Sequence, residues 1–205
     1  MTQPLRTIVP PATAFRKLRE GITGQRVLIR IWQDTDTHPL FECIDRSRQH
    51  LRAWMDWIDR HQTPGDTQEY ITRSLLEFTR RDNIGLGIFD KRDNHTILGG
   101  TGFHDINWVV PSVEIGYWAA VDKAGNGYIT EAVAVLTDFA FREFAAERIA
   151  IHCDPRNERS RAVAERCGYV LEGQLRNHQR TGNGGLRDTL IFSRIPDDGQ
   201  QKTGE

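Results

Sequence analysis

The stretch Gly125-Asn126-Gly127-Tyr128-Ile129-Thr130-Glu131-Ala132 stands between a strand pattern and an amphipathic helix pattern. Two glycines just before a helix let backbone N–H groups converge where a Cβ would obstruct them, and the unpaired amides of the helix N-terminus carry about half a positive charge. The stretch therefore fits a phosphate or diphosphate, although glycine turns ahead of helices are common and a purely structural role stays open. A dinucleotide fingerprint would need a third glycine at Thr130, and a P-loop would need Gly-Lys-Ser/Thr, which appears nowhere.

The patterns around this stretch alternate between strands and helices. The helix that follows it has a buried stripe at helical spacing, formed by Val133, Leu136, Thr137, Ala140 and Phe144. A first strand runs from Val27 to Asp34, and one helical pattern continues from there to a break at Pro64-Gly65-Asp66, after which a second helix begins. The remaining predicted elements are strands 84–90, 96–103, 112–119, 148–153, 169–175 and 187–195 and a helix at 158–167. The predicted order is β-αα-βββ-α-β-α-ββ, a mixed α/β (α+β) sheet.

The length of 205 residues suits one domain, which we expect at 25–195. Residues 1–24 form an N-terminal extension containing three prolines, and we expect it to be poorly fixed unless something packs on it. Residues 196–205 contain no hydrophobic side chain that could pack into a core, and this composition predicts a disordered tail.

The charges are balanced, with 27 Lys+Arg against 28 Asp+Glu and a net charge of -1. This balance excludes the large basic field of a general nucleic-acid binder. No apolar run approaches the roughly 18 residues of a membrane-spanning helix, and the first residues lack the pattern of an export signal. Cys43, Cys153 and Cys167 are scattered, which fits reduced thiols better than disulfides or a zinc site. We therefore expect a cytoplasmic protein without nucleic-acid, membrane or metal partners.

Several further motifs follow one another along the chain. They are His50-Leu51-Arg52-Ala53-Trp54-Met55-Asp56-Trp57, Leu98-Gly99-Gly100-Thr101-Gly102-Phe103, Val113-Glu114-Ile115-Gly116-Tyr117-Trp118, the glycine stretch, Asn157-x-x-Ser160 and Cys167-Gly168-Tyr169-x-x-Glu172-Gly173-x-x-Arg176. In this order they resemble the GNAT acetyltransferases, and within them the RimJ/RimL-like ribosomal-protein-alanine N-acetyltransferases. The resemblance spans roughly 25–195. It implies the GNAT acyl-CoA N-acyltransferase fold, a mixed and mostly antiparallel sheet flanked by helices.

The resemblance also implies acetyl-CoA as cosubstrate, with no metal. In the family the strands corresponding to 112–119 and 148–153 splay apart, and the pantetheine arm lies between them like an added strand. Tyr117, Trp118 and Ala119 would supply backbone bonds to this arm, and Asn157 would hold its far side. The diphosphate would bind Gly125, Asn126, Gly127, Tyr128, Ile129 and Thr130.

The implied reaction is direct attack of a primary amine on the thioester, most simply by the α-amino group of a ribosomal or other protein or of a peptide. At pH 7 deprotonation costs roughly 1.4 kcal/mol for an α-amine but about 4.6 kcal/mol for lysine, so an α-amine needs only modest help from a base. Ser160 matches the family's hydroxyl on the thiol side and is the candidate acid. Glu114 is the candidate base, directly or through water, because it lies on the strand beside the cofactor.

Two positions depart from the family pattern. Asp122 stands where many relatives carry Gln or Arg. An acid beside a diphosphate is unfavourable unless its side chain turns away, so we expect the glycine stretch to bind the diphosphate through its backbone alone. The stretch 176–180, where a relative's proposed base lies, contains His178 in place of a glutamate. The base therefore stays open between Glu114, His178 and water.

Other readings of the chain remain. The acceptor could be a small amine such as an antibiotic or polyamine, for which acidic residues lining the acceptor site would argue. The chain could also be a non-catalytic acetyl-CoA-binding module that regulates a partner, or, less in keeping with the motifs, bind a nucleotide at the glycine stretch. A homodimer is plausible for the subfamily, but no interface can be read from the sequence.

Overall fold

The structure, a computed structural model, describes residues 10–181 and 184–199. Residues 200–205 of the predicted tail and 1–9 of the N-terminal extension lie outside the described residues. The helices are α1 (Ala12–Glu20), α2 (Thr37–Leu51), α3 (Pro64–Arg80), α4 (Tyr128–Glu143) and α5 (Glu158–Arg166), with short 3-10 turns at Asp34–Asp36, Asp56–Arg60 and Pro196–Gly199. The strands are β1 (Ile22–Thr23), β2 (Val27–Ile31), β3 (Ile84–Asp90), β4 (Ile97–Asn107), β5 (Ser112–Ala119), β6 (Arg148–Cys153), β7 (Val170–Arg180) and β8 (Leu186–Arg194).

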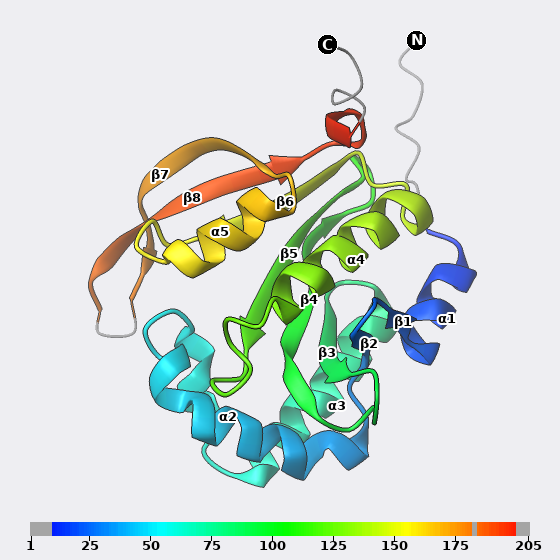
Figure 1. The fold of residues 1–205 in the computed structure, drawn as a ribbon, viewed down its shortest axis with the longest axis vertical. Coiled ribbons are helices and arrows are strands. Elements are labelled where there is room, and N and C mark those ends of the chain that lie inside the picture. Colours follow the sequence, from blue (N-terminus) through cyan, green and yellow to red (C-terminus); the bar gives the residue numbers. More distant parts are fainter. Residues whose placement is uncertain (1–9, 182–183, 200–205) are drawn as a thin grey trace.

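The strands form one twisted sheet in the order β1-β2-β3-β4-β5-β6-β8-β7 (Figure 1). Neighbouring strands are antiparallel except β5 and β6, which are parallel. A parallel pair needs a crossover, and α4 supplies it. The predicted mixed, mostly antiparallel sheet flanked by helices is confirmed.

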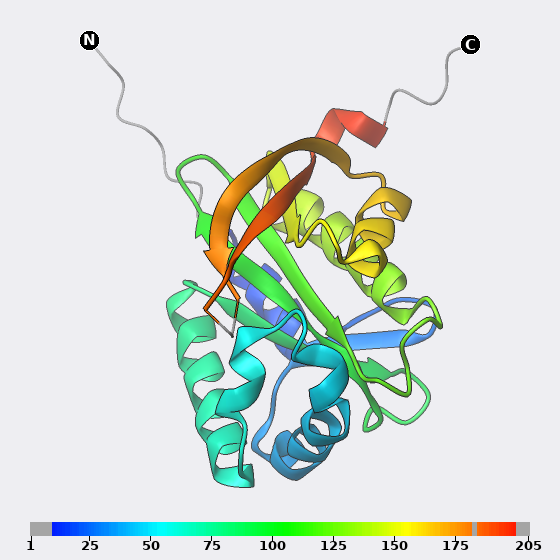
Figure 2. The same ribbon diagram turned by 90° about the vertical axis from the view of Figure 1, so that its left-hand side faces the viewer.

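The face of the sheet toward α4 carries the larger core. Every second residue of β2, β3 and β5 points to this face, and α4 covers it with its apolar stripe, including Val133 and Leu136, which are fully buried. Figure 2 shows α4 and α5 on one side of the sheet and α2 and α3 on the other.

The face toward α2 and α3 is lined partly by glycines instead of side chains. Gly85 and Gly87 of β3, Gly100 and Gly102 of β4 and Gly116 of β5 occupy facing register positions on this side. A Cβ at Gly100 would lie 2.3 Å from the Trp118 indole nitrogen, and one at Gly116 would lie 2.9 Å from the His104 ring. The glycines therefore let large rings lie flat on the sheet and leave room beneath α2 and α3.

The structure differs from the predicted elements in several places. β4 and β7 continue to Asn107 and Arg180, beyond the predicted ends at 103 and 175. Helix α1 and strand β1 precede the predicted first strand. The helical pattern that continues to Ile58 is interrupted: α2 ends at Leu51, and the rest of the pattern falls in a turn and the 3-10 segment before His61. Pro64 does not follow a helix but begins α3, where its missing N–H costs nothing.

Helix α1 packs on the domain. Ala14, Phe15 and Leu18 are buried in the same cluster as the sheet, and the Phe15 ring stacks on Phe144 at the end of α4. This packing fixes residues 12–20 of the N-terminal extension. Within the described ranges, no helix has the length and apolarity needed to cross a membrane.

Truncation of Leu18 tests this packing. Leu18 is 0% exposed, so Leu18→Ala is expected to lower the free energy of unfolding by about 2–5 kcal/mol, measured by urea denaturation. Leu76→Ala, at a position 49% exposed on α3, is the matched control and should change it by less than about 0.5 kcal/mol. Equal effects of the two variants would contradict a packed α1.

Candidate active site

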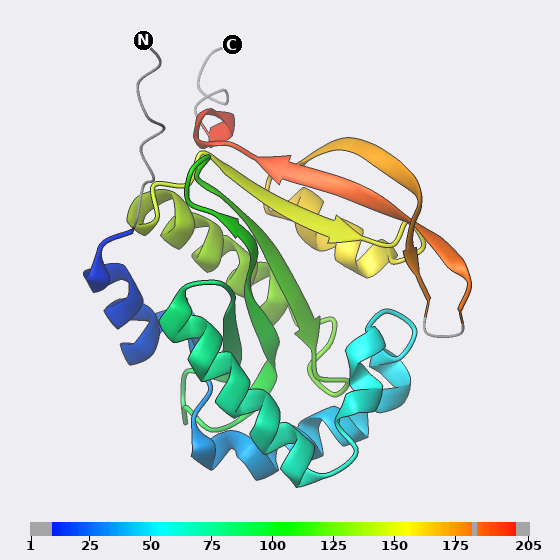
Figure 3. The ribbon, with the colours of Figure 1, turned by 180° about the vertical axis from the view of Figure 1, so that it is seen from behind.

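β5 and β6 separate part of the way along their length. They pair at Ser112–Arg148, Val113–Ile149 and Glu114–Ala150, and the described residues show no ladder pair beyond Glu114. β5 stays paired with β4 up to Ala119, and β6 stays paired with β8 up to Cys153. Figure 3 shows the two strands diverging as the sides of a V. From Ile115 onward one edge of β5 therefore has backbone groups free to bind an extended ligand.

Two cavities meet at this V. The first, here called the loop cleft, measures about 1070 Å³ and is lined by the glycine stretch and by the first turns of α4 and α5. The second, here called the inner cavity, measures about 650 Å³ and lies between the glycine-lined face of the sheet and α2 and α3. Both are lined by Tyr117, Trp118, Asn157 and Ser160. The V is thus where the two sides of the sheet communicate.

The glycine stretch has the backbone that an anion site needs. Gly125 and Gly127 have φ angles of 82° and 79°, in the left-handed region that favours glycine. Gly127 is the N-cap of α4, and no side chain caps this helix, so the amides of its first turn are available to a ligand. The helix begins at Tyr128, so Thr130 is its third residue and lies in the first turn, at the start of the helix as expected.

Arg26 anchors this stretch to the edge of the sheet. Its side chain donates from Nε to Glu131 Oε2 at 2.9 Å and from Nη1 to the Asn126 carbonyl at 3.0 Å. The guanidinium also lies 4.7 Å from the centre of the Tyr128 ring. In return Glu131 accepts from the backbone N–H of Arg26 at 2.6 Å. These contacts hold the glycine stretch in one conformation.

The charges around the loop cleft favour an anionic ligand. Its lining contains four cationic side chains, Arg26, Lys123, Arg159 and Arg166, against the carboxylates of Glu131 and Glu158. Asp122 is not among the lining residues: it forms ion pairs with Lys123 at 3.1 Å and Arg46 at 3.4 Å. The Asp122 carboxylate is therefore held by Arg46, outside the cleft, and by Lys123, on its rim, and does not itself line the cleft.

A hydroxyl pair stands where the cavities meet. The Tyr117 hydroxyl lies 3.1 Å from Ser160 Oγ and donates to the Ser160 carbonyl at 3.0 Å. Burial raises the pKa of Tyr117, so the phenol stays protonated. Asn157, and not Ser160, caps α5: Asn157 Oδ1 accepts from the Ser160 N–H at 3.1 Å. The Ser160 hydroxyl is therefore free of capping.

A carboxylate–imidazole pair lies at the apex of the V. His152 Nδ1 is 2.8 Å from Glu114 Oε2, and both residues line the inner cavity. The hydrogen bond to Glu114 raises the pKa of His152. His104 faces Glu114 across the β4–β5 ladder and lines the same cavity, but burial lowers its pKa.

His178 lies apart from this group. It is exposed on β7, where its Nδ1 contacts Thr189 Oγ1 at 3.1 Å, and it does not line either cavity. Of the three predicted catalytic residues, the structure brings Glu114 and Ser160 to the V. The predicted cofactor residues Tyr117, Trp118 and Ala119, the stretch 125–130 and Asn157 all line the loop cleft.

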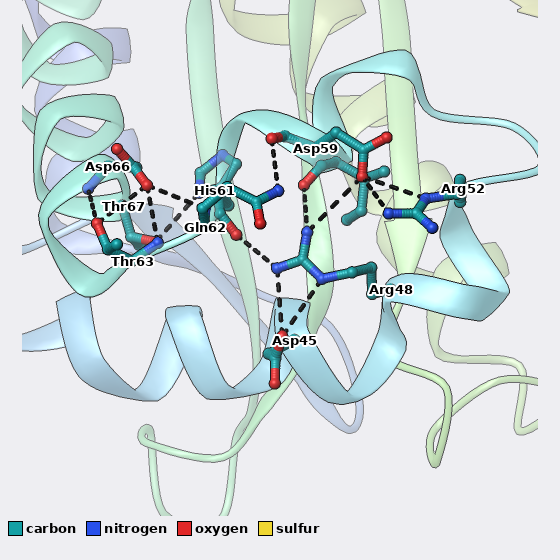
Figure 4. Close-up of polar contacts among 10 residues, drawn as sticks. Asp45, Arg48, Arg52, Asp59, His61, Gln62, Thr63, Asp66 and Thr67 are labelled. Carbon is teal, nitrogen blue, oxygen red and sulfur yellow. Dashed lines mark hydrogen bonds and ion pairs between the residues drawn. The ribbon is translucent and has the colours of Figure 1, made fainter. Parts of the chain in front are cut away.

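The segment between α2 and α3 forms the outer wall of the inner cavity. Arg48 of α2 holds it by donating to the carbonyls of Ile58 at 2.9 Å and His61 at 2.5 Å (Figure 4). Trp57 and His61 on this segment make edge contacts, with ring centres 5.5 Å apart. Burial lowers the pKa of His61 to about 4, so this aromatic wall is uncharged at neutral pH.

Sequence reasoning missed His152 and Arg26. Alternation along the predicted strand 148–153 places the His152 side chain on one face of the sheet. Its contact with Glu114, however, can be predicted only if the register between the two strands, which are 30 residues or more apart in the sequence, is known. Arg26 gives no local signal, because it is far from the glycine stretch in the sequence and contacts it only in the folded chain. Among the described residues, no group of three or more His, Cys, Asp or Glu side chains is arranged to hold a metal ion.

Comparisons with known proteins agree with this geometry. The Acetyltransferase (GNAT) domain family matches residues 26–170. The chain is 30% identical over 174 residues to "Putative ribosomal N-acetyltransferase YdaF" of Bacillus subtilis (strain 168), covering 83% of this chain and 91% of that protein. It is 26% identical to the ribosomal-protein-serine acetyltransferase of Escherichia coli (strain K12), covering 78% and 87%. A crystal structure of the microcin C7 self-immunity acetyltransferase MccE, in complex with acetyl-CoA and AMP, has the same fold, with a TM-score of 0.79, 24% identity and coverage of 83% and 93%.

Replacement of Gly127 tests the anion site. Gly127→Val is expected to weaken CoA binding at least about tenfold, because a β-branched residue is strained at this φ and its side chain would meet Arg26. Isothermal titration calorimetry measures the affinity. Gly173→Val, at an open position of β7 without a positive φ, is the control and should bind CoA normally. An unchanged affinity in Gly127→Val would refute the assignment of the stretch.

Proposed function

This chain belongs to the GNAT acetyltransferase family, and from that premise we propose that it transfers the acetyl group of acetyl-CoA to the α-amino group of a protein or peptide. As a member of the family it is an acetyl-CoA-dependent N-acetyltransferase. The observation that carries the proposal is the meeting of two cavities at a V between β5 and β6, with a hydroxyl pair and a carboxylate–imidazole pair beside it.

The loop cleft suits the diphosphate of acetyl-CoA. The first-turn amides of α4 and the positive-φ backbone at Gly125 and Gly127 would bind its oxygens, and the surplus of cations around the cleft would stabilise its charge. The pantetheine arm would extend the sheet along the free edge of β5 at Tyr117–Ala119, with Asn157 on its other side. Acetyl-CoA supplies the thioester that the amine attacks.

The side chains at the V suit the two proton movements of the reaction. An ammonium must lose a proton before its nitrogen can attack, and Glu114 with its partner His152 faces the cavity that would admit it. The departing sulfur gains negative charge, and the Ser160 hydroxyl, 3.1 Å from that of Tyr117, is the donor that we assign to it. A backbone N–H on the free edge of β5 would stabilise the oxyanion.

The charges of the inner cavity support an α-amine over a polycation. Five carboxylates line it, those of Asp66, Glu69, Glu77, Glu114 and Asp154, but three arginines, Arg60, Arg73 and Arg187, line it as well. Asp154 also pairs with Arg156 at 2.7 Å, and Asp66 accepts from two backbone amides ahead of α3. This small surplus of negative charge, with the Glu114–His152 pair at the V, suits one ammonium group, as a chain terminus provides. The volume of about 650 Å³ also suits a small amine, which is the second candidate acceptor.

An acceptor screen tests the proposed reaction. The purified protein is given acetyl-CoA and panels of N-terminal peptides, internal-lysine peptides blocked at the N-terminus, polyamines and aminoglycosides, and thiol release is measured. We expect release with the free α-amine peptides, and mass spectrometry should locate the acetyl group on the N-terminus. Release with polyamines or aminoglycosides alone would overturn the assignment of the acceptor. Binding of acetyl-CoA without release by any amine would favour a regulatory module.

Replacement of Ser160 tests the acid. Ser160→Ala is expected to lower kcat at least about tenfold and to change CoA affinity by less than about twofold, because the hydroxyl acts on the departing thiolate. Steady-state kinetics and calorimetry measure the two effects. Ser112→Ala, at the paired end of β5, serves as the control. A wild-type kcat in Ser160→Ala would remove the acid role from this residue.

A further inference from the structure

We propose that His152 is the group that takes the proton from the acceptor ammonium, at its Nε2 atom, while Glu114 acts as the positioning residue that orients the imidazole. The proposal deepens the proposed function and rests on it. It differs from the expectation from sequence, in which Glu114, His178 or water is the base.

The contact with Glu114 fixes the orientation of the His152 ring. His152 Nδ1 is 2.8 Å from Glu114 Oε2, so the Nδ1 hydrogen is donated to the carboxylate. In neutral imidazole only one nitrogen carries hydrogen, and the lone pair is therefore on Nε2. A carboxylate that fixes the tautomer of a histidine base in this way is the arrangement of the Ser-His-Asp proteases.

The Glu114–His152 pair lies at the point where β5 and β6 separate. Glu114–Ala150 is the last pair in the β5–β6 ladder, and His152 is two residues farther along β6 on the same face as Ala150. His152 therefore lies on the first part of β6 that has left β5, at the narrow end of the V. Its ring lines the inner cavity, from which the acceptor would approach.

The groups packed around His152 come from four strands. From β5, Glu114 is the charged group that faces His152; β4 contributes His104 and Asp105; β6 itself contributes Arg148; and on β8 the paired residue is the apolar Ile191. The hydrogen bond to Glu114 raises the pKa of His152 toward working pH, where a general base is most effective, whereas burial lowers the pKa of His104.

The ammonium N–H bond breaks and its proton passes to Nε2, which gives an imidazolium beside the Glu114 carboxylate. The freed nitrogen lone pair attacks the thioester carbonyl carbon, the C–S bond breaks, and the sulfur leaves with the electron pair. The attacking nitrogen loses a second proton to solvent as the C–S bond breaks, which leaves a neutral amide. The thiolate takes a proton from the Ser160–Tyr117 hydroxyl pair, which regains one from solvent, and His152 returns its proton to solvent, so the products are the amide, the thiol and one released proton.

The test compares the pH dependence of kcat in variants with an acceptor peptide chosen from the screen. In the wild type kcat should fall below the pKa of His152 with a slope of one. His152→Gln should lose about 100-fold in kcat at pH 7 and lose this limb, and its rate should rise with the fraction of free amine up to about pH 9. Glu114→Gln should keep the limb but shift it to lower pH, because removal of the carboxylate lowers the pKa of His152.

Controls distinguish the expected result from misfolding of a variant and from failure of the proposed function. CoA affinity and the melting temperature should stay unchanged in both variants, and the His152 resonance in NMR titrations should move to lower pH in Glu114→Gln. His38→Gln, at an exposed position on α2, is the matched control. His104→Gln should leave the limb in place. A His152→Gln enzyme that keeps the limb and the rate, or a limb lost only in Glu114→Gln, would overturn the proposal. No turnover in the wild type would instead refute the proposed function.

Discussion

β5 and β6 diverge because each is held along its length by its other neighbour. β5 is paired with β4 up to Ala119, and β6 is paired with β8 up to Cys153, so the twist of the sheet opens the space between them once their three shared pairs end. The backbone groups on the free edge of β5 have no strand partner there, and an unpaired buried amide or carbonyl costs free energy. An extended amide-bearing ligand can satisfy these groups, which is why the opening is a binding site and not a defect of the sheet.

The two faces of the sheet are built for different tasks. On the α4 side, branched side chains of β2, β3 and β5 fill the space with a continuous core, and this makes the first turn of α4 a rigid support for the glycine stretch. On the other side, glycines on β3, β4 and β5 replace side chains. In the second cluster of buried residues, Leu40, Ile44 and Ile71 come from α2 and α3. The inner cavity exists because of this difference. Its outer wall then depends on Arg48, which holds the irregular segment before α3 through carbonyl contacts (Figure 4).

Local sequence patterns predicted the helices and strands whose apolar residues recur with one clear helical or strand spacing. The bounds of the other elements depend on contacts between residues far apart in the sequence. Strands 84–90, 112–119 and 148–153 have the predicted bounds, because alternation and burial agree there. The end of α2 could not be predicted, since Ile58 continues the apolar spacing and packs into the same cluster from a 3-10 turn. Helix α1 is short, and the prolines ahead of it suggested a loop. The glycine stretch, Ser160 and Glu114 were recognisable from motifs, but His152 becomes a candidate only once the parallel register is known.

The alternation of β5 explains how two substrates of opposite charge can meet. Glu114, Gly116 and Trp118 face α2 and α3, whereas Tyr117 faces α4 and α5, where its hydroxyl meets Ser160. A closed sheet would separate a cationic amine on the first side from an anionic cofactor on the second. The V opens the sheet at the residues between these groups, and Glu114 and Tyr117 are about 10 Å apart along the strand, which leaves room for the reacting atoms. The glycine stretch and the first-turn amides of α4 follow β5 beyond Ala119, so the diphosphate and the carboxylate at the apex would be kept apart by the part of β5 that has left β6.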